Sequence, residues 1–539
     1  MKGLRRYAHT LRHLKPWQVV GRIAAPLRRR QAVWRVQETP SDLRLIGRAH
    51  TAFPAHAPWN TRSDVLAGRF CFLNETADLG RPVDWRAGER PLLWQFNLHY
   101  FHYLHLVEPE EQVALCREWI GSNPIGRGVG WHPYPTALRI VNWCRAELTA
   151  SDCLRSLYQQ AAYLHRNVET HIYGNHLLEN ARALVLAGCY LRGQGEADAW
   201  LEHGVSIYRR ETDEQVLSDG LHFERSPMYH ALMLEGYLDV LNVLPDGHAD
   251  RPWLAETARA MTDALAGVTH PDGQIALFND STFEIAPSPV ALLDYANRVL
   301  GHTPQPTLVF VEAGYFVYDG EDAWLMVDAG PGGPDYLMAH AHADVFSYEL
   351  SLGGHRFIVD TGVYEYAAGD MRQYVRRTAA HNTVEVDDTD QMECWDSFRV
   401  GRRAEPHEVV WKPSSRGVEF KGTFAGYEEL IGDNIRHTRR LTLDETQRTL
   451  IIEDEIEGEG WHQVSSRIHL HPEVTAQKQS GTWRLSRNGV ACTLSMDGAE
   501  VKLEGAWYCP QFGTRRKNHV LVLRSSGVLP KLIRYAIRY

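Results

Sequence analysis

The spacing of hydrophobic residues changes near residue 305 of this 539-residue chain. Between about 90 and 300, apolar residues recur at intervals of three and four, as in Leu154, Leu157 and Tyr158, which predicts amphipathic helices. After GHTPQP at 301–306, alternating and β-branched runs such as TLVFVEAGYFVYDG predict short strands. Because these strands follow one another without intervening helices, an antiparallel sandwich is favoured over a parallel sheet.

The pattern divides the chain into three segments. Residues 1–84 form a basic N-terminal segment and an extended lead-in, 85–305 an all-helical region, and 306–539 an all-β region. Within the last segment, Asn488-Gly489 and Asp497-Gly498 stand between short alternating runs. Both dipeptides favour the left-handed backbone of hairpin turns, so we expect a β-hairpin at each.

Composition excludes several classes of protein. With 44% hydrophobic and 23% charged residues, the chain is typical of a folded protein rather than a disordered or collagen-like one. No stretch approaches about 18 uninterrupted apolar residues, which argues against a transmembrane segment. A net charge of −10 argues against a general nucleic-acid binder, because affinity for phosphate comes from clustered Lys and Arg. Eight cysteines without a C-x-x-C pattern predict buried, reduced thiols.

The charge is unevenly distributed. Residues 1–30 contain nine Lys and Arg and no acidic residue, so the rest of the chain carries a formal charge of −19. Apolar residues in this segment recur at helical spacing and predict a short amphipathic helix that ends before Pro16. A peripheral contact with a membrane surface is one interpretation. A helix packed on the protein, with solvated arginines, is the other.

The same segment bears on location. It lacks the uninterrupted apolar core of a secretory signal, and no small-residue cleavage site follows it. We therefore expect a protein that is cytoplasmic or peripheral at the inner membrane, with the periplasm as the alternative.

Four polar clusters carry candidate chemistry, and the first two lie at predicted helix starts. GNHLLEN at 174–180 places Asn175 and His176 before a helix, where Asn175 alone also fits an N-cap. DGLHFERSPMYH at 219–230 places Tyr229 before another helix. A tyrosine in that position is also common as half-buried packing with a hydrogen-bonded hydroxyl.

The other two clusters lie among the predicted strands. AHAHAD at 339–344 leads into FSYELSL, and His340 and His342 would face the same side of a strand. Asp360 in FIVDTG and His381 in AHNT would lie on neighbouring strands of that sheet. Two imidazoles and one carboxylate suit zinc or a similar divalent ion. Histidines at strand ends also serve as ordinary hydrogen-bonded residues.

Taken together and in this order, the clusters resemble the heparinase II/III family of polysaccharide lyases. The resemblance runs from about residue 90 and includes WHPYPTALRIVNW at 131–143, GNHLLEN, ERSPMYH, AHAHAD, VDTG and HNT. It implies a multidomain α and β fold, an N-terminal incomplete (α/α) toroid followed by a C-terminal antiparallel β-sandwich, with the active site between them. This architecture agrees with the change of period near residue 305.

The family cleaves uronic-acid polysaccharides by β-elimination, which explains the residue types. Removal of the C5 hydrogen is opposed by the neighbouring carboxylate, so that group must be neutralised. The resemblance implies that Asn175 and His176 do this, with Glu179 as a neighbouring support or substrate contact. Tyr229 and His340 match the family's proton-transfer groups.

Two assignments of the proton transfers are open. If the two protons lie on opposite faces of the sugar, His340 is the base and Tyr229 the acid; on a single face, Tyr229 serves both steps. The resemblance further implies that His342, Asp360 and His381 bind a divalent metal, with zinc the expected ion. The metal would support the architecture of the site rather than supply a nucleophile.

Further residues are assigned to substrate binding. They are Glu179, Glu224, Arg225, Trp131 and Arg139. Trp131 and Arg139 lie in the helical block that the resemblance covers, where they are also ordinary packing residues. Three later arginines either attract an acidic polymer or belong to a solvated loop: Arg372, Arg376 and Arg377.

The leading hypothesis is a lyase acting on an acidic, uronic-acid-containing polysaccharide, linked to exopolysaccharide or capsule production because no export signal is recognised. A glycoside hydrolase that uses Glu224 and Asp280 as paired carboxylates is the first alternative. A non-catalytic polysaccharide-binding protein of an export assembly is the second.

Overall fold

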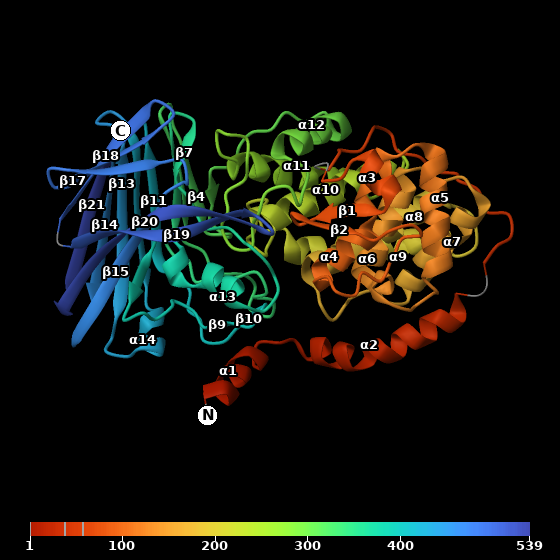
Figure 1. Cartoon of the computed structure of the whole chain (residues 1–539), viewed down its shortest axis with the longest axis horizontal. Helices are drawn as coiled ribbons and strands as arrows, with labels where there is room; N and C mark the ends of the chain where they lie inside the picture. Colours follow the sequence, from red (N-terminus) through yellow and green to blue (C-terminus); the bar gives the residue numbers. More distant parts are fainter. Residues whose placement is uncertain (1, 37–38, 57–58, 498) are drawn as a thin grey trace.

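The computed structural model describes residues 2–36, 39–56, 59–497 and 499–539. A helical region and a β-rich region lie side by side along the longest axis (Figure 1). The last helix of the helical region ends at Leu300 and the first strand after it begins at Val309, on either side of the expected boundary. A helical toroid followed by an antiparallel sandwich is the fold class that the sequence predicts.

The helical region is built from paired helices. They are α4 (Leu92–Tyr100), α5 (Pro109–Ser122), α6 (Pro133–Arg145), α7 (Ser151–His165), α8 (Gly174–Tyr190), α9 (Ala197–Gln215), α10 (Pro227–Val243), α11 (Arg251–Gly267) and α12 (Pro289–Leu300). Two 3-10 turns, η1 (His102–Leu106) and η2 (Val129–Trp131), connect the early helices. Helix α8 packs against α6, α9 and α10, and both α8 and α10 are buried on nearly all sides. The two helices that carry predicted site residues therefore lie in the centre of the region.

The β-rich region contains three main antiparallel sheets. One has five strands in the order β3 (Val309–Phe310), β4 (Tyr315–Asp319), β5 (Ala323–Asp328), β6 (Tyr348–Leu352) and β7 (His355–Ile358). A second has the order β19 (Glu500–Gln511), β20 (Thr514–Val528), β15 (Trp461–His469) and β8 (Val384–Val386). The third has the order β11 (His407–Ser414), β12 (Gly417–Phe424), β13 (Arg436–Asp444), β14 (Thr449–Glu457), β21 (Lys531–Arg538), β18 (Val490–Asp497), β17 (Thr482–Arg487) and β16 (Thr475–Gln479).

The sheets pack as two layers. A bridge between Ile358 and Leu470 joins the five-stranded and four-stranded sheets along one edge. Hydrophobic residues from both, and from the eight-stranded sheet opposite, form one buried cluster, as expected for a sandwich. Short elements complete the region: helix α13 (Asp370–Arg376), turn η3 (Thr378–Ala380), helix α14 (Gly426–Leu430) and the strand pair β9 (Cys394–Trp395) and β10 (Arg399–Val400).

One of the two predicted hairpins is present. Asn488-Gly489 joins the paired strands β17 and β18. The prediction at Asp497-Gly498 is wrong, because β18 pairs with β17 and β21 whereas β19 pairs with β20 in the other layer. Gly498 itself lies outside the described residues. The chain therefore changes layers there instead of folding back on itself.

The N-terminal segment is more helical than expected. Helix α1 (Lys2–Leu11) ends before Pro16, as predicted, but it is followed by the 20-residue helix α2 (Pro16–Arg35), whereas we expected only a basic segment and an extended lead-in up to residue 84. Pro26 inside α2 and its arginine-rich sequence obscured the helical pattern. Helix α3 (Arg62–Ala67) and the hairpin β1 (Arg69–Phe72) and β2 (Glu75–Asp78) follow.

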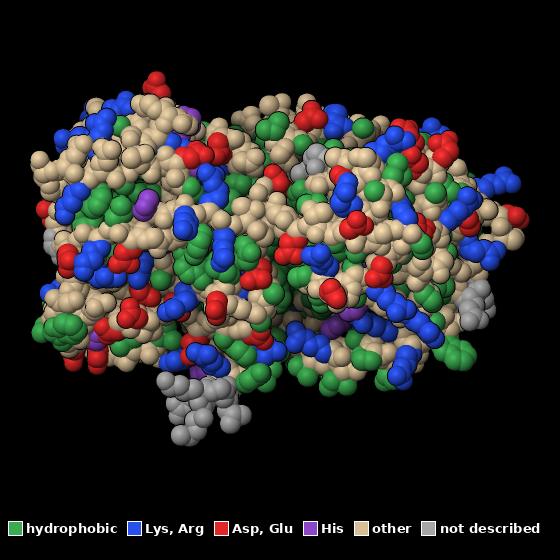
Figure 2. Space-filling view, in the orientation of Figure 1, with side chains coloured by type: hydrophobic (Ala, Val, Ile, Leu, Met, Phe, Trp, Pro, Cys, Tyr) green, Lys and Arg blue, Asp and Glu red, His purple; other side chains and the backbone are tan. Residues whose placement is uncertain are grey.

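The two N-terminal helices run along one edge of the molecule (Figure 1). Basic and hydrophobic side chains gather along the same edge in the space-filling view (Figure 2). In the described part of the chain, no helix combines the length and the apolar character needed to cross a membrane.

Candidate active site

Three segments from different parts of the chain meet where the helical region joins the sandwich. Asn175 and His176 come from the first turn of α8, Tyr229 from the first turn of α10, and His340 from the loop that precedes β6. We expected His340 and His342 on a strand, but both lie in this loop. The structure therefore brings together all four residues that were predicted to be catalytic.

Tyr229 is positioned by the start of α10. Ser226 caps the helix by accepting a hydrogen bond from the backbone N–H of Tyr229 at 3.2 Å, and Pro227 occupies the first turn. The Tyr229 hydroxyl lies 3.2 Å from that of Tyr366. Burial, and then the neighbouring Tyr366, raise the pKa of Tyr229 well above its ordinary value. Tyr229 therefore carries its proton at neutral pH.

The His340 ring is held between Tyr229 and Asp280. Its centroid lies 4.0 Å from that of Tyr229, with the two planes inclined by 33°. Nδ1 lies 2.9 Å from Asp280 Oδ2, and Nε2 lies 3.8 Å from Glu224 Oε2. Because the carboxylate of Asp280 can only accept, Nδ1 carries a hydrogen, and in the neutral imidazole Nε2 is therefore the nitrogen with the free lone pair.

Asp280 connects His340 to the buried guanidinium of Arg372. Its two oxygens accept hydrogen bonds from the Arg372 guanidinium, of which the Nη2 contact is 2.8 Å, and Oδ1 lies 2.9 Å from His342 Nε2. Although burial alone would raise the pKa of Asp280, Arg372 and the two imidazoles hold it well below its ordinary value. The carboxylate therefore stays ionised and fixes the orientation of His340.

Asn175 is anchored through Glu224. The side-chain Nδ2 lies 2.9 Å from Glu224 Oε2, and the backbone N–H donates to Oε1 at 3.1 Å. Gly174 permits this approach, because it has a positive φ of 58° and a Cβ there would collide with the Glu224 carboxylate. Glu224, predicted to bind substrate, is 2% exposed and instead links Asn175 to His340.

His176 faces more open space than its neighbours. Its side chain is 32% exposed, and the ring lies against Tyr134 with centroids 4.4 Å apart. Nδ1 lies 3.2 Å from Glu169 Oε2. Burial lowers the pKa of His176, but Glu169, together with Glu224 and Glu179, more than offsets this, so the pKa is raised overall. A protonated His176 would present positive charge to an anionic ligand.

Two predicted substrate-binding residues lie in the helical core. Arg139 is fully buried, stacks over Trp119 at 3.9 Å and donates to the Gly130 carbonyl at 2.7 Å. Trp131 is 3% exposed and donates to the Asn123 carbonyl. The prediction that these two side chains line a sugar groove is wrong, because their polar groups are occupied within the fold.

Glu179 and Arg225 are also engaged by the protein. Glu179 is 1% exposed and pairs with Arg182 at 3.2 Å, so it is a support residue rather than a substrate contact. The Arg225 guanidinium donates to three backbone carbonyls. These carbonyls belong to Phe223, Glu312 and Ala313. Arg225 therefore ties the start of α10 to the sandwich.

The later arginines have separate roles. Arg372 and Arg376 are fully buried, which contradicts both a solvated loop and a polymer-attracting surface at these two positions. Arg377, by contrast, is half-exposed and lies 3.5 Å from Asp390.

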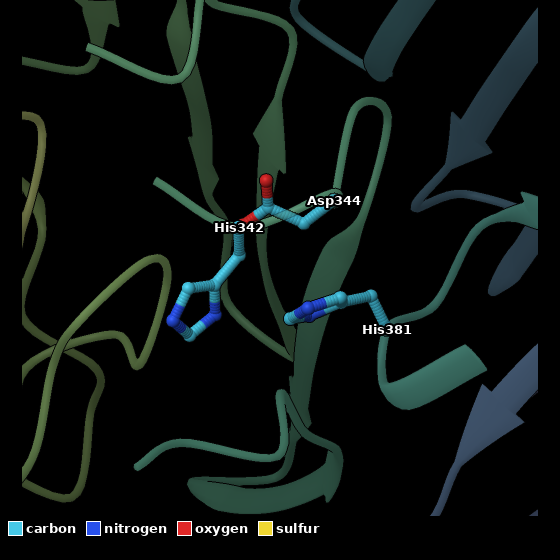
Figure 3. Close-up of side chains that lie close together, drawn as sticks. All are labelled: His342, Asp344 and His381. Atoms are coloured by element: carbon cyan, nitrogen blue, oxygen red, sulfur yellow. The ribbon is translucent and has the colours of Figure 1, made fainter. Parts of the chain in front are cut away.

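Three polar side chains behind His340 form a candidate metal centre. His342, Asp344 and His381 are buried, and one ligand atom from each lies within 4.8 Å of the others. Figure 3 shows the two imidazole rings facing each other beside the Asp344 carboxylate. His342 Nδ1, Asp344 Oδ2 and His381 Nε2 are buried without a hydrogen-bond partner among the described residues. Three orphaned, adjacent ligand atoms are the arrangement that a cation would satisfy.

Asp360 has a different place from the one predicted. Its Oδ2 lies 2.7 Å from His381 Nδ1, on the far side of the ring from the orphaned Nε2. Asp344, and not Asp360, belongs to the group whose candidate ligand atoms lie within 4.8 Å of one another, and Asp360 fixes the orientation of His381. The expected placement on separate strands is also wrong, since the histidines precede β6 and β8 in loop segments.

Sequence reasoning missed several residues of the site. They are Glu169, Asp344, Tyr134 and Tyr366. Of these four, only Asp344 could have been recognised from the sequence, because it ends the AHAHAD motif that contains His340 and His342.

Comparison with known families gives two matches. The model described as "Heparinase II/III N-terminus" matches residues 145–295, and that described as "Heparinase II/III-like, C-terminal" matches residues 302–536. Together they cover most of the chain and meet at the boundary between helices and strands.

Curated relatives match over shorter parts of their length. A heparin-sulfate lyase of Pedobacter heparinus is 24% identical over 367 residues, which are 58% of this chain and 54% of that protein. A heparin-sulfate lyase of Bacteroides stercoris is 29% identical over 246 residues, 39% of this chain and 35% of that protein. The chain thus spans about half, or less, of the length of these relatives.

Solved structures share the fold. A crystal structure of heparinase III has a TM-score of 0.66 at 17% identity, covering 86% of this chain and 80% of that one. A mutant heparan sulfate lyase from Pedobacter heparinus has a TM-score of 0.61 at 18% identity, covering 97% of this chain and 88% of that one.

Proposed function

The chain belongs to the heparinase II/III family, and we propose that it is a polysaccharide lyase that cleaves a uronic-acid-containing polysaccharide by β-elimination. One observation carries the proposal. A protonated tyrosine, Tyr229, lies against an imidazole, His340, whose Nδ1 is fixed by Asp280. β-Elimination requires one group that takes the C5 proton and another that protonates the leaving glycosidic oxygen, and the two candidates lie within one site.

The first turn of α8 would bind the substrate carboxylate. The raised pKa of His176 favours its cation, and its partly exposed ring faces the junction of the two regions. Positive charge there would stabilise the enolate-like form that develops when the C5 proton leaves. Asn175, held by Glu224, would contribute an amide to the same group. The heparin-sulfate lyases that this chain resembles support an acidic polysaccharide as substrate.

The proton transfers are assigned by the states of the two side chains. His340 Nε2, with its lone pair free, takes the C5 proton. Tyr229 protonates the leaving glycosidic oxygen. The raised pKa of Tyr229 favours this arrangement over one in which tyrosinate acts as the base.

A hydrolase mechanism fits the site less well. It needs one carboxylic acid that is protonated and a second carboxylate across the sugar. Asp280 is fully buried, and both of its oxygens are occupied by Arg372 and histidines, so its pKa is held low despite its burial. Asp280 therefore cannot donate a proton to the leaving group.

We also propose a zinc ion, or a similar divalent cation, at His342, Asp344 and His381. The orphaned nitrogens and carboxylate oxygen are ligands that zinc accepts, and burial lowers the pKa of His342 to about 3, so that nitrogen is unprotonated. A bound cation supplies positive charge that holds the loop in place. The protein's part is to position His340, two residues from His342, against Asp280.

Ligand substitutions distinguish the centre proposed here, with Asp344, from the one predicted from sequence, with Asp360. Asp344→Asn and His381→Ala should remove bound zinc, whereas Asp360→Asn should weaken zinc affinity by about 10–100-fold, because Asp360 acts through His381. Metal content of the purified variants, with zinc titration followed by melting temperature, measures this. His437→Gln, which alters a buried imidazole elsewhere in the sandwich, is the control. Loss of zinc in Asp360→Asn with normal zinc in Asp344→Asn would instead support the ligands predicted from sequence, His342, Asp360 and His381.

Zinc affinity should also depend on pH. Burial raises the pKa of Asp344 to about 6, and the carboxylate must be ionised to bind the cation. Asp360 raises the pKa of His381 despite its burial, and this imidazole must also be unprotonated to bind. Affinity should therefore fall as the pH drops from 8 to 5, because His381 and Asp344 both take up protons. A titration that shows no change between pH 5 and 8 would contradict the role of Asp344.

The activity itself is tested by incubating the protein with a panel of uronate-containing polymers. Elimination creates a C4–C5 double bond that absorbs in the near ultraviolet, whereas a polysaccharide-binding protein would bind without any product. Binding to a polymer that never yields products would favour the non-catalytic alternative. A role in exopolysaccharide or capsule production, and a cytoplasmic or inner-membrane location, stay predictions from the sequence.

A further inference from the structure

The outward face of α2 carries a stripe of exposed hydrophobic side chains. Val20, Ile23, Leu27 and Trp34 have exposed fractions of 65%, 75%, 63% and 81%. Their spacing of three, four and seven residues places them on one side of the helix. Large apolar side chains lined up in water mark a surface that contacts a partner.

The opposite face of α2 is packed on the protein. Gln18 is buried and its Nε2 donates to the Tyr336 carbonyl at 3.4 Å. Gly21 lies against the side chain of His171, and Ala32 is 1% exposed. The helix is therefore held by its inner face, and the hydrophobic stripe is left outside.

Basic residues accompany the stripe. Helix α2 contains five arginines and no acidic residue, and exposed Arg22 and Arg30 flank the apolar side chains. Exposed Arg6 and Arg12 extend the basic surface along α1. Figure 2 shows blue and green side chains together along this edge. The surface is positive although the rest of the chain, beyond residue 30, carries a formal charge of −19.

We propose that this face of α2 docks on an anionic membrane surface. A bilayer interface accepts both parts of the pattern, because lipid headgroups attract the arginines while the apolar side chains enter the acyl boundary. Trp34, 81% exposed, stands at the C-terminal end of the stripe, where an indole ring favours the interface.

Two other binding partners would each match only the charge or only the hydrophobicity of this face of α2. An anionic polysaccharide would pair with the arginines but leave the apolar stripe in water. A second copy of the chain would cover the stripe but oppose two arginine-rich helices. Membrane binding satisfies charge and hydrophobicity together.

Docking would place the bilayer beside the active site. Trp17 Nε1 donates to the hydroxyl of Tyr173, the residue that precedes the first turn of α8. The inner face of α2 thus contacts the segment that leads to Asn175 and His176. A membrane-bound molecule would hold this side of the catalytic junction close to the lipid surface.

Vesicle flotation with the full chain tests the proposal. The protein should float with vesicles of phosphatidylcholine and phosphatidylglycerol and not with phosphatidylcholine alone, and binding should weaken with salt. The double variant Ile23→Glu/Leu27→Glu should lower the bound fraction by at least about tenfold. The matched control is Val290→Glu/Val311→Glu, which changes two side chains that are 67% and 78% exposed elsewhere, and it should bind normally.

Three results would overturn the proposal. The first is no flotation with anionic vesicles, and the second is unchanged binding of the Ile23→Glu/Leu27→Glu variant. The third is a concentration-dependent dimer in light scattering that this variant dissolves, which would assign the face to a second copy. Circular dichroism and melting temperature establish that each variant is folded, and because both substitutions are at exposed positions we expect no change in either.

Discussion

Replacing Tyr229 with phenylalanine is expected to lower kcat/KM for polymer cleavage by about 10²–10⁴-fold, the usual contribution of a general acid. The substitution removes only the hydroxyl, which lies 3.2 Å from that of Tyr366, and keeps the ring that packs on His340. The melting temperature should therefore change little. Initial rates of near-ultraviolet absorbance on the best polymer of the panel measure the effect.

Tyr366→Phe is the matched control for this experiment. It removes the partner hydroxyl at the same distance but no proton-transfer group, so the loss should be about tenfold or less. Full activity in Tyr229→Phe would remove Tyr229 from the mechanism. A larger loss in Tyr366→Phe than in Tyr229→Phe would transfer the acid role to Tyr366.

Replacing Asp280 with asparagine is expected to affect both activity and stability. The amide cannot accept from Arg372, His340 and His342 together, so His340 loses the partner that fixes its hydrogen on Nδ1. Activity should fall by about 10²–10⁴-fold. A buried, unpaired Arg372 should also lower the free energy of unfolding by about 3–5 kcal/mol.

Asp454 provides a control that separates the two effects. It is equally buried in the sandwich, accepts from Arg439 at 2.7 and 2.8 Å and lies 2.8 Å from His437. Asp454→Asn should destabilise the protein by a similar amount but leave the kcat of the folded fraction unchanged. Denaturant unfolding measures the stability of both variants, and kcat per folded molecule measures their activity. Equal losses of kcat in the two would show that Asp280 acts through stability alone.

The fold class could be predicted because the spacing of apolar residues along the chain indicates which segments are helices and which are strands. Helical spacing up to about residue 300 and alternation after 306 each reflect how a single element buries one face. The order of the motifs was enough to predict that Tyr229 and His340 lie in the same site, although 111 positions separate them in the sequence. Helix α2 was missed because Pro26 and the run of arginines interrupt its apolar pattern.

The connections within the site could not be predicted in the same way. Asp280, Arg372 and His340 belong to three separate segments, and no local pattern says that one carboxylate will serve both imidazoles and a guanidinium. The candidate metal centre shows the same limit. Asp344 and Asp360 are both carboxylates of the recognised motifs, and only the three-dimensional arrangement shows that Asp344 lies with the orphaned nitrogens of His342 and His381.

The substrate-binding predictions failed for a related reason. Trp131 and Arg139 are residue types that bind sugars when exposed, yet here they stack within the toroid core. Residue type in a motif therefore does not by itself indicate a groove residue, because the exposure of a side chain depends on the whole fold.

The central claim, bond cleavage by elimination, is tested most directly by counting two kinds of chain end in the same reaction. Each elimination makes one C4–C5 unsaturated uronate, detected by its near-ultraviolet absorbance, for every new reducing end. We predict a ratio of unsaturated to reducing ends of one, which Tyr229→Phe leaves unchanged while it lowers the rate. New reducing ends without a gain in absorbance would mean hydrolysis and would contradict the account.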